Sequence, residues 1–219
     1  IITDGVFSMD GDYAPLDEVN KLAEEFGAMV LVDDCHGEGV LGEGGRGLVD
    51  HFKLQGKVDF EVGSFSKALG VQGGILAGTE MTRTHALNHS RSWLLSGSQP
   101  PGVAAAQKAA IEVLMEEPEH HAKLWENTNY FRKELQSLGF DTGVSTTPII
   151  PIMCGESSTA KEMTNHLQNE GVMAGAIVFP MVARDKARIR TQMSSGLSRD
   201  DLDEVLRLLE SIGPKVGLI

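Results

Sequence analysis

Apolar and polar positions alternate along the chain in two different rhythms. After Pro15, apolar residues recur at helical spacing over residues 16–26, and a glycine follows that favours the end of a helix. Residues 28–32 then form a continuous apolar run that ends in Asp33 and Asp34. A run without polar alternation is typical of a strand buried on both faces, as in a parallel sheet covered by helices. The pattern therefore predicts a helix followed by a buried parallel strand.

Two more short apolar runs, residues 60–63 and 74–78, indicate further strands. This alternation of strands and helices predicts an α/β fold with a mostly parallel sheet and helices on both faces. Beyond about residue 100 the pattern changes to long helical stretches mixed with isolated strands. We expect two domains, with a boundary near residue 110 and an antiparallel α+β module after it. The elements expected in this second part are helices over 103–115, 120–138, 159–169 and 199–212, and strands or apolar segments over 148–153, 172–182 and 187–193.

The composition narrows the class of protein. With 219 residues, of which 41% are hydrophobic, the chain has the make-up of a globular protein rather than a disordered one. A net charge of −12 argues against nucleic acid or an anionic membrane surface as the main partner. Cys35 and Cys154 are too few for a disulfide scaffold and fit a reducing compartment, such as the cytoplasm or the mitochondrial matrix. No apolar run approaches the roughly 20 residues that a membrane span needs.

The first candidate site lies where the buried strand ends. Asp33 and His36 stand three residues apart at its carboxyl end, and ligands of open α/β sheets bind at that edge. Together with Glu38 they offer ligands for a metal ion. They also fit an acid–base pair, and Asp33 alone fits pairing with a ring nitrogen of a heteroaromatic cofactor. A structural role, in which Asp34 and His36 only cap the loop, is the remaining alternative.

The second candidate site follows the next predicted strand. Ser64, Ser66 and Lys67 precede a glycine-rich stretch, and a lysine behind small hydroxyl residues fits a Schiff-base amine with the hydroxyls holding a phosphate. Ser64 and Lys67 also match the Ser-x-x-Lys motif of penicillin-binding enzymes, but the two partner motifs that this chemistry requires are absent. The order of lysine before glycine excludes a Walker phosphate loop.

Two arginines form a third candidate. Arg188 and Arg190 alternate along a predicted strand and so point to the same side. In a chain this acidic, the pair suggests bidentate capture of a carboxylate or phosphate. A surface strand with two solvated arginines is the alternative. Cys35 and Cys154 are expected to be structural, since the chain has no Cys-x-x-Cys motif.

Four segments taken together resemble the α-oxoamine synthases, pyridoxal-phosphate (PLP) enzymes of the aspartate-aminotransferase-like fold (fold type I) that condense an amino acid with an acyl-CoA. These segments are residues 4–11, 32–37, 63–68 and 187–194, in the family's order and spacing across nearly the whole chain. Within the family, Asp-Gly-Val-Phe-Ser-Met-Asp-Gly and Ala-Arg-Ile-Arg-Thr-Gln-Met-Ser look most like glycine C-acetyltransferase (2-amino-3-ketobutyrate CoA ligase). The sister enzymes, which make 8-amino-7-oxononanoate, 5-aminolevulinate or 3-ketosphinganine, share most of the cofactor residues.

The resemblance implies a cofactor, pyridoxal 5'-phosphate, and a role for each site residue. It implies that Lys67 forms the covalent aldimine and moves the Cα proton, that Asp33 pairs with the pyridine nitrogen, and that His36 hydrogen-bonds the phenolic oxygen. The other residues that it implies are hydroxyls around the cofactor and an arginine for the amino-acid carboxylate: Ser8 beside the phenolic oxygen, Ser64 and Ser66 on the phosphate, Ser98 on the phosphate of the neighbouring subunit, and Arg190, rather than Arg188, on the carboxylate. The implied unit is a homodimer with shared active sites.

The implied reaction condenses glycine with acetyl-CoA to give 2-amino-3-oxobutanoate and CoA. Another α-oxoamine synthase, such as the 8-amino-7-oxononanoate synthase of biotin biosynthesis, and a non-catalytic fragment acting as an assembly partner are the alternatives. The resemblance also implies that the chain is the C-terminal half or so of a family member, and an opening without initiator Met or leader fits that expectation. Residues 1–110 are then the C-terminal part of the large PLP-binding domain, and residues 111–219 the small domain.

Overall fold

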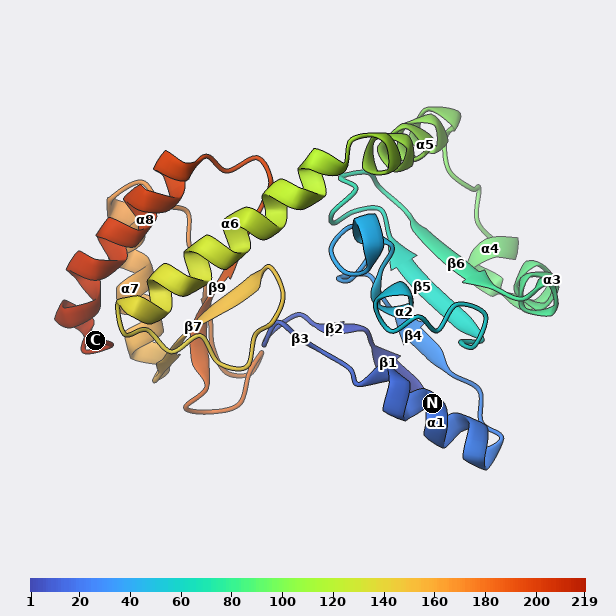
Figure 1. The fold of residues 1–219 in the computed structure, drawn as a ribbon, viewed down its shortest axis with the longest axis horizontal. Coiled ribbons are helices and arrows are strands. Elements are labelled where there is room, and N and C mark those ends of the chain that lie inside the picture. Colours follow the sequence, from blue (N-terminus) through green and yellow to red (C-terminus); the bar gives the residue numbers. More distant parts are fainter. The chain divides into compact units, whose positions relative to one another are not determined.

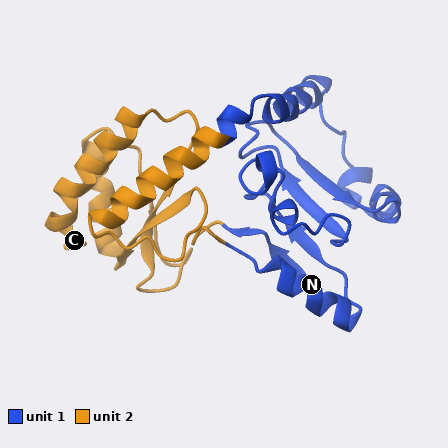
Figure 2. Cartoon of the chain, viewed as in Figure 1, with its two compact units in different colours: residues 1–7, 13–121 blue, residues 8–12, 122–219 orange.

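The structure, a computed structural model, describes all 219 residues and contains two compact units. Figure 2 shows them in different colours: unit 1 comprises Ile1–Phe7 and Tyr13–His121, and unit 2 comprises Ser8–Asp12 and Ala122–Ile219. The boundary therefore lies about ten residues beyond the predicted one. The reason is that His121, early in α6 (Pro118–Ser137), hydrogen-bonds through Nε2 to the Val40 carbonyl oxygen at 2.9 Å and stays with unit 1.

Unit 1 is built around a four-stranded sheet of order β1-β4-β5-β6 (Figure 1). The first three strands in this order are parallel, and β6 runs antiparallel to β5. The mostly parallel sheet that the sequence predicts is thus confirmed. The strands are β1 (Ile2–Asp4), β4 (Leu31–Asp33), β5 (Phe60–Ser64) and β6 (Gly74–Gly78).

The helix after Pro15 is α1 (Leu16–Phe26), as predicted, and it ends because Gly27 adopts a left-handed φ of 60°. It buries Leu16 and Ala23, and Val32 of β4 is buried as well. The sheet is not buried on both faces over its whole width, because all five residues of the edge strand β6 are exposed. The other helices of unit 1 are η1 (Glu43–Gly45), α2 (Leu48–His51), α3 (Glu80–His89), α4 (Arg91–Leu94), α5 (Pro101–Glu116) and the first residues of α6.

Unit 2 contains an antiparallel three-stranded sheet of order β7-β9-β8, as the antiparallel module of the prediction requires. Figure 1 shows helices α6, α7 and α8 around this sheet. Its apolar core joins the three helices to the strands, for example through Phe131, Met163, Ile189 and Leu209. The elements are β7 (Ile149–Gly155), α7 (Ser157–Asn169), β8 (Ala176–Ile177), β9 (Ala187–Gln192), α8 (Arg199–Ile212) and η2 (Gly213–Val216).

A short segment from the beginning of the chain, residues 8–12, belongs to unit 2. Its anchor is the Gly11 carbonyl oxygen, which accepts the backbone N–H groups of Thr146 and Thr147 at 3.0 and 3.1 Å. Gly11 needs its glycine, because its φ is +74° and a Cβ there would lie 2.2 Å from the Ile149 carbonyl oxygen. Strands β2 (Val6–Phe7) and β3 (Asp12–Tyr13) flank the segment as a two-stranded ribbon. None of the helices combines the length and the apolar character that crossing a bilayer requires.

Candidate functional site

Asp33 is the last residue of β4, and the turn that follows is fastened to the neighbouring strand. The Asp33 Oδ1 accepts the Cys35 backbone N–H at 3.1 Å, and the Asp34 N–H donates to the Val62 carbonyl oxygen of β5 at 2.8 Å. His36 is half-buried in the same turn. Parallel pairing of β4 with β5 thus puts the candidate residues of both strands at one edge of the sheet.

The Cys35 thiol lies close to both main candidates. Burial raises the pKa of this thiol to about 11, the Asp33 carboxylate adds to the rise, and the Lys67 ammonium opposes it. The thiol therefore stays protonated at neutral pH, which agrees with the structural role predicted for Cys35. Both charged groups are thus near enough to the thiol to influence its ionisation.

The loop that carries Lys67 is held by its backbone and by two hydroxyls. Ser64 and Ser66 form an Oγ–Oγ hydrogen bond of 2.7 Å, and the Ser66 N–H donates to the Ser64 Oγ at 3.2 Å. Buried Phe65 anchors the loop, and its carbonyl oxygen accepts the Val71 N–H at 2.7 Å. Lys67 itself is exposed. Two adjacent hydroxyls and an accessible amine are thus presented at the end of β5.

Gly39 brings the loop after β4 against the loop after β5. Its φ is +75°, and a Cβ there would lie 2.5 Å from the Ala68 Cβ, next to Lys67. Glu38 joins the same two segments: its Oε2 accepts the Ser64 N–H at 3.1 Å. The carboxylate of Glu38, considered as a possible metal ligand in one of the alternatives, is used for this contact, and the chain has no group of three His, Cys, Asp or Glu side chains arranged to hold a metal ion.

Asp34 has the structural role that the alternative describes for it, but in the interior: it is buried, with 3% of its surface exposed. Its Oδ2 accepts the Leu48 N–H at 2.6 Å, and its Oδ1 has no partner. The pKa of this carboxyl is raised to about 7, mainly by burial and also by the nearby carboxylates of Glu38, Glu61 and Asp33. Three glycines make room for it, because a Cβ would approach its oxygens to 2.0–2.5 Å at each of Gly5, Gly37 and Gly47.

Ser98 lies in the exposed segment between α4 and α5, with a φ of +64°. Its neighbour Gln99 contacts the Gln107 amide, which donates to the Gln72 carbonyl oxygen at 2.7 Å. Gln107 was missed by the sequence analysis because nothing in a helical stretch marks one glutamine as buried. The role of Ser98 toward a neighbouring subunit stays a prediction.

Unit 2 brings Ser8 and Arg190 together, although 182 residues separate them along the chain. The Arg190 Nη1 donates to the Ser8 carbonyl oxygen at 3.0 Å. Arg188 forms a buried ion pair with Asp10, which the sequence analysis missed as a functional candidate. The alternative of two solvated surface arginines is therefore wrong for Arg188, whose side chain is only 4% exposed.

The chain matches the family of class I and II aminotransferases over residues 1–209. It belongs to this family. Its relatives include α-oxoamine synthases, which confirms the resemblance to that group of enzymes. The solved structures that it matches confirm fold type I.

Two bacterial relatives are named 8-amino-7-oxononanoate synthase. The protein of Symbiobacterium thermophilum is 50% identical and that of Bacillus subtilis 48% identical over 219 residues, and each alignment covers 100% of this chain and 56% of the relative. The chain thus spans about half the length of the curated relatives it matches.

Solved structures of serine palmitoyltransferase (SPT) superpose closely. One, described as SPT with PLP internal aldimine, gives a TM-score of 0.94 at 30% identity, and the enzyme of Sphingomonas wittichii gives 0.95 at 30%. Each superposition covers 100% of this chain and 55% of the solved one. PLP, the cofactor that the resemblance implies, is thus the cofactor of solved relatives. The narrower resemblance to glycine C-acetyltransferase is not supported, since these relatives carry other names.

We expect Asp34→Asn to flatten the pH dependence of stability. Because the raised pKa makes the folded chain bind a proton that the unfolded chain has lost, the free energy of unfolding falls as pH rises from 3.8 to about 7. The slope contributed by one such group is at most about 1.4 kcal/mol per pH unit. The amide keeps an oxygen for the Leu48 N–H but cannot ionise.

Urea unfolding at several pH values measures this slope. Asp141→Asn is the control for loss of one carboxylate, since the exposed Asp141 also accepts a backbone N–H, from Gly143 at 2.8 Å. Equal slopes in the parent chain and Asp34→Asn would contradict the prediction.

We expect Gly39→Ala to destabilise the chain more than Gly56→Ala. Both glycines have a φ near +75°, so both variants carry the same backbone strain, of about 1–2 kcal/mol. Only Gly39 faces the Ala68 Cβ, and a Cβ at Gly56 meets no atom within 4 Å. Overpacking adds about 1–3 kcal/mol to the loss at Gly39. Denaturant unfolding of the two variants measures the difference, and equal losses would contradict the close approach.

Proposed function

We propose that this chain carries the reacting lysine and the ring-nitrogen carboxylate of a PLP-dependent α-oxoamine synthase, which joins an amino acid to the acyl group of an acyl-CoA. The observation that carries the proposal is the parallel pairing of β4 with β5, which places Asp33 at the end of one strand and the loop of Lys67 at the end of the next, with Gly39 packed against Ala68, next to Lys67. Membership of the aminotransferase family supports the same assignment.

The residues present fit the chemistry of the cofactor. A protonated ring nitrogen matches the Asp33 carboxylate, an anionic phosphate matches the hydroxyls of Ser64 and Ser66, and an aldehyde carbon matches the exposed Lys67 amine. The bound cofactor supplies an electron sink that stabilises negative charge at the Cα of an amino acid. His36, in the same turn as Asp33, is proposed to donate to the phenolic oxygen, with Ser8 beside it.

Each residue then has a defined task in the proposed reaction. Asp33 keeps a proton on the ring nitrogen, because a carboxylate next to a cation favours the charged form of its partner. Lys67 takes the proton from Cα and returns one after the new bond has formed. Arg190 holds the carboxylate of the amino acid through its planar guanidinium. We propose a homodimer, in which Ser98 serves the phosphate of the partner's site.

The name of the two relatives at 48–50% identity suggests the substrates. In 8-amino-7-oxononanoate, carbons 8 and 9 with the amino group correspond to alanine that has lost its carboxylate as CO2. Carbons 1 to 7 correspond to a seven-carbon dicarboxylic acyl group carried on CoA. We therefore propose this reaction as the first candidate, since relatives at 48–50% identity carry that name. Condensation of glycine with acetyl-CoA is the second candidate, favoured by the segments 4–11 and 187–194.

We expect the purified chain, in the longest form that its gene encodes, to give a visible absorption band with added PLP that borohydride makes permanent. Lys67→Ala abolishes the band, because no other amine stands at that position. Lys53→Ala is the matched control, since Lys53 is also an exposed lysine of unit 1. A band of equal strength in Lys67→Ala would contradict the proposal.

The fate of the amino-acid carboxylate separates the two candidate reactions. With alanine labelled at the carboxylate and the seven-carbon acyl-CoA, we expect release of labelled CO2 in step with free CoA. With glycine and acetyl-CoA, the enzyme leaves the label in the four-carbon product, a β-keto acid that loses CO2 afterwards in solution without the enzyme. Release of CO2 then lags behind release of CoA. Thiol titration for CoA and trapping of CO2 measure the two time courses. CoA release from acetyl-CoA with glycine, and none from the seven-carbon acyl-CoA with alanine, would exclude the first candidate.

A further inference from the structure

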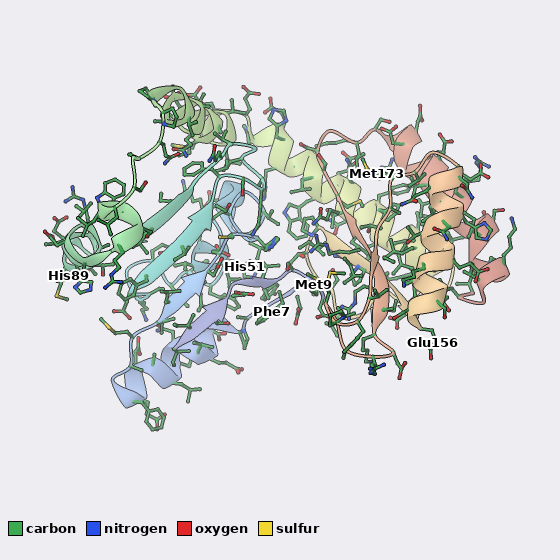
Figure 3. All side chains as sticks on the ribbon, turned by 180° about the vertical axis from the view of Figure 1, so that it is seen from behind. Phe7, Met9, His51, His89, Glu156 and Met173 are labelled. Carbon is green, nitrogen blue, oxygen red and sulfur yellow. The ribbon has the colours of Figure 1, made fainter.

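Strand β9 presents two guanidinium groups on one side, and the protein uses them differently. Arg188 and Arg190 both hydrogen-bond to residues 8–10, whereas Ile189 between them is 2% exposed and lies in the apolar core. Figure 3 labels Met9 within this segment. One side of β9 therefore packs into the apolar core of unit 2, and the other side holds residues 8–10 by hydrogen bonds.

The guanidinium of Arg188 donates three hydrogen bonds within the protein. Its Nη1 donates to the Met9 carbonyl oxygen at 2.8 Å and to the Asp10 carboxylate, and its Nε donates to the Lys186 carbonyl oxygen at 3.1 Å. With only 4% of the side chain exposed, it is not placed to meet a ligand from solvent. The Asp10 carboxylate, which is half-exposed, compensates its charge.

Arg190 keeps most of its binding capacity. It is only partly buried, and the contact of Nη1 with the Ser8 carbonyl oxygen is the one bond that the protein makes with its guanidinium. Its Nε and Nη2 remain as a planar pair of donors, the arrangement that a carboxylate accepts in a bidentate manner. Because Asp10 neutralises Arg188, the charge of Arg190 is the one left for an anion.

The position of Arg190 thus depends on where Ser8 lies. Two anchors fix the segment that contains Ser8: the Gly11 carbonyl oxygen, held by Thr146 and Thr147, and the pair of Asp10 with Arg188. In the second anchor, Asp10 lies two residues from Ser8, and Arg188 belongs to β9, the strand that also carries Arg190. We infer that Asp10 and Arg188 are positioning residues that orient Arg190 for the carboxylate of the amino-acid substrate, an inference that rests on the proposed function.

The test compares an amino acid with its amide in the longest form of the protein that the gene encodes. Alanine and alaninamide, or glycine and glycinamide, share the amine that reacts with the cofactor, but only the acid offers a carboxylate to Arg190. The concentration that half-shifts the Lys67-dependent absorption band is measured for each ligand. The variants are Asp10→Asn, Arg188→Met, the double variant, Arg188→Lys and Arg190→Met.

In Asp10→Asn and Arg188→Met we expect the midpoint for the acid to rise roughly 10- to 100-fold, the range expected when a binding group is misplaced by about an ångström. The midpoint for the amide stays unchanged. The double variant loses no more than either single one, because both remove the same pair. Arg188→Lys keeps the cation and recovers part of the loss. Arg207→Met is the control, since Arg207 faces Glu204 on the exposed side of α8.

Two results in Asp10→Asn and Arg188→Met would overturn this inference but not the proposed function. One is an equal rise of the midpoint for acid and amide, which marks a merely structural role. The other is no rise for either ligand, while Arg190→Met still raises the midpoint for the acid. An unchanged midpoint in Arg190→Met would overturn it as well. Absence of the band in the parent protein would overturn the proposed function and this inference together. Thermal unfolding of Asp10→Asn, at a half-exposed position, verifies that the variant is folded.

Discussion

A single buried carboxyl group, that of Asp34, holds together the loops on which the candidate site depends. Its Oδ2 binds the first N–H of α2, and glycines at positions 5, 37 and 47 allow three segments to close around it. An oxygen buried without a partner costs about 1–3 kcal/mol, so the packing around it must offset that loss. The benefit is a rigid turn, in which Asp33 is fixed at the end of β4 beside the loop that carries Lys67.

Much of the fold was predictable because its strands and helices have clear apolar periods. The helix over 199–212 was predicted with its true ends, and the structure shows a capping box of Ser198 and Asp201 at its start. Short elements such as α3 and α4 were not predicted, because their residues are mostly exposed and show little apolar periodicity. The transfer of residues 8–12 to unit 2 was also unpredictable, since it depends on hydrogen bonds to residues far along the chain.

The candidate site was predictable where a residue with a reactive or charged side chain directly follows a predicted strand. Asp33 and Lys67 were selected as candidates because a carboxylate and a lysine stand at the ends of successive apolar runs, and the parallel pairing of β4 with β5 brings these ends to one edge of the sheet. The pairing of Arg188 with Asp10 was not found, because 178 residues separate the partners and the sequence records only their charges. The same limit explains why the burial of Asp34 was not predicted: whether an acidic residue is buried depends on the residues around it, here the glycines 5, 37 and 47.

The long separation between Asp10 and Arg188 also orders the events of protein synthesis. Residues 8–12 are synthesised well before β9, because 178 residues separate Asp10 from Arg188. The four strands of the sheet in unit 1 lie within residues 2–78 and are therefore also made before β9. The segment 8–12 must stay unpaired with β9 while the residues between them are translated. Closure of unit 2 over this segment is consequently a late step, which joins residues far apart along the chain.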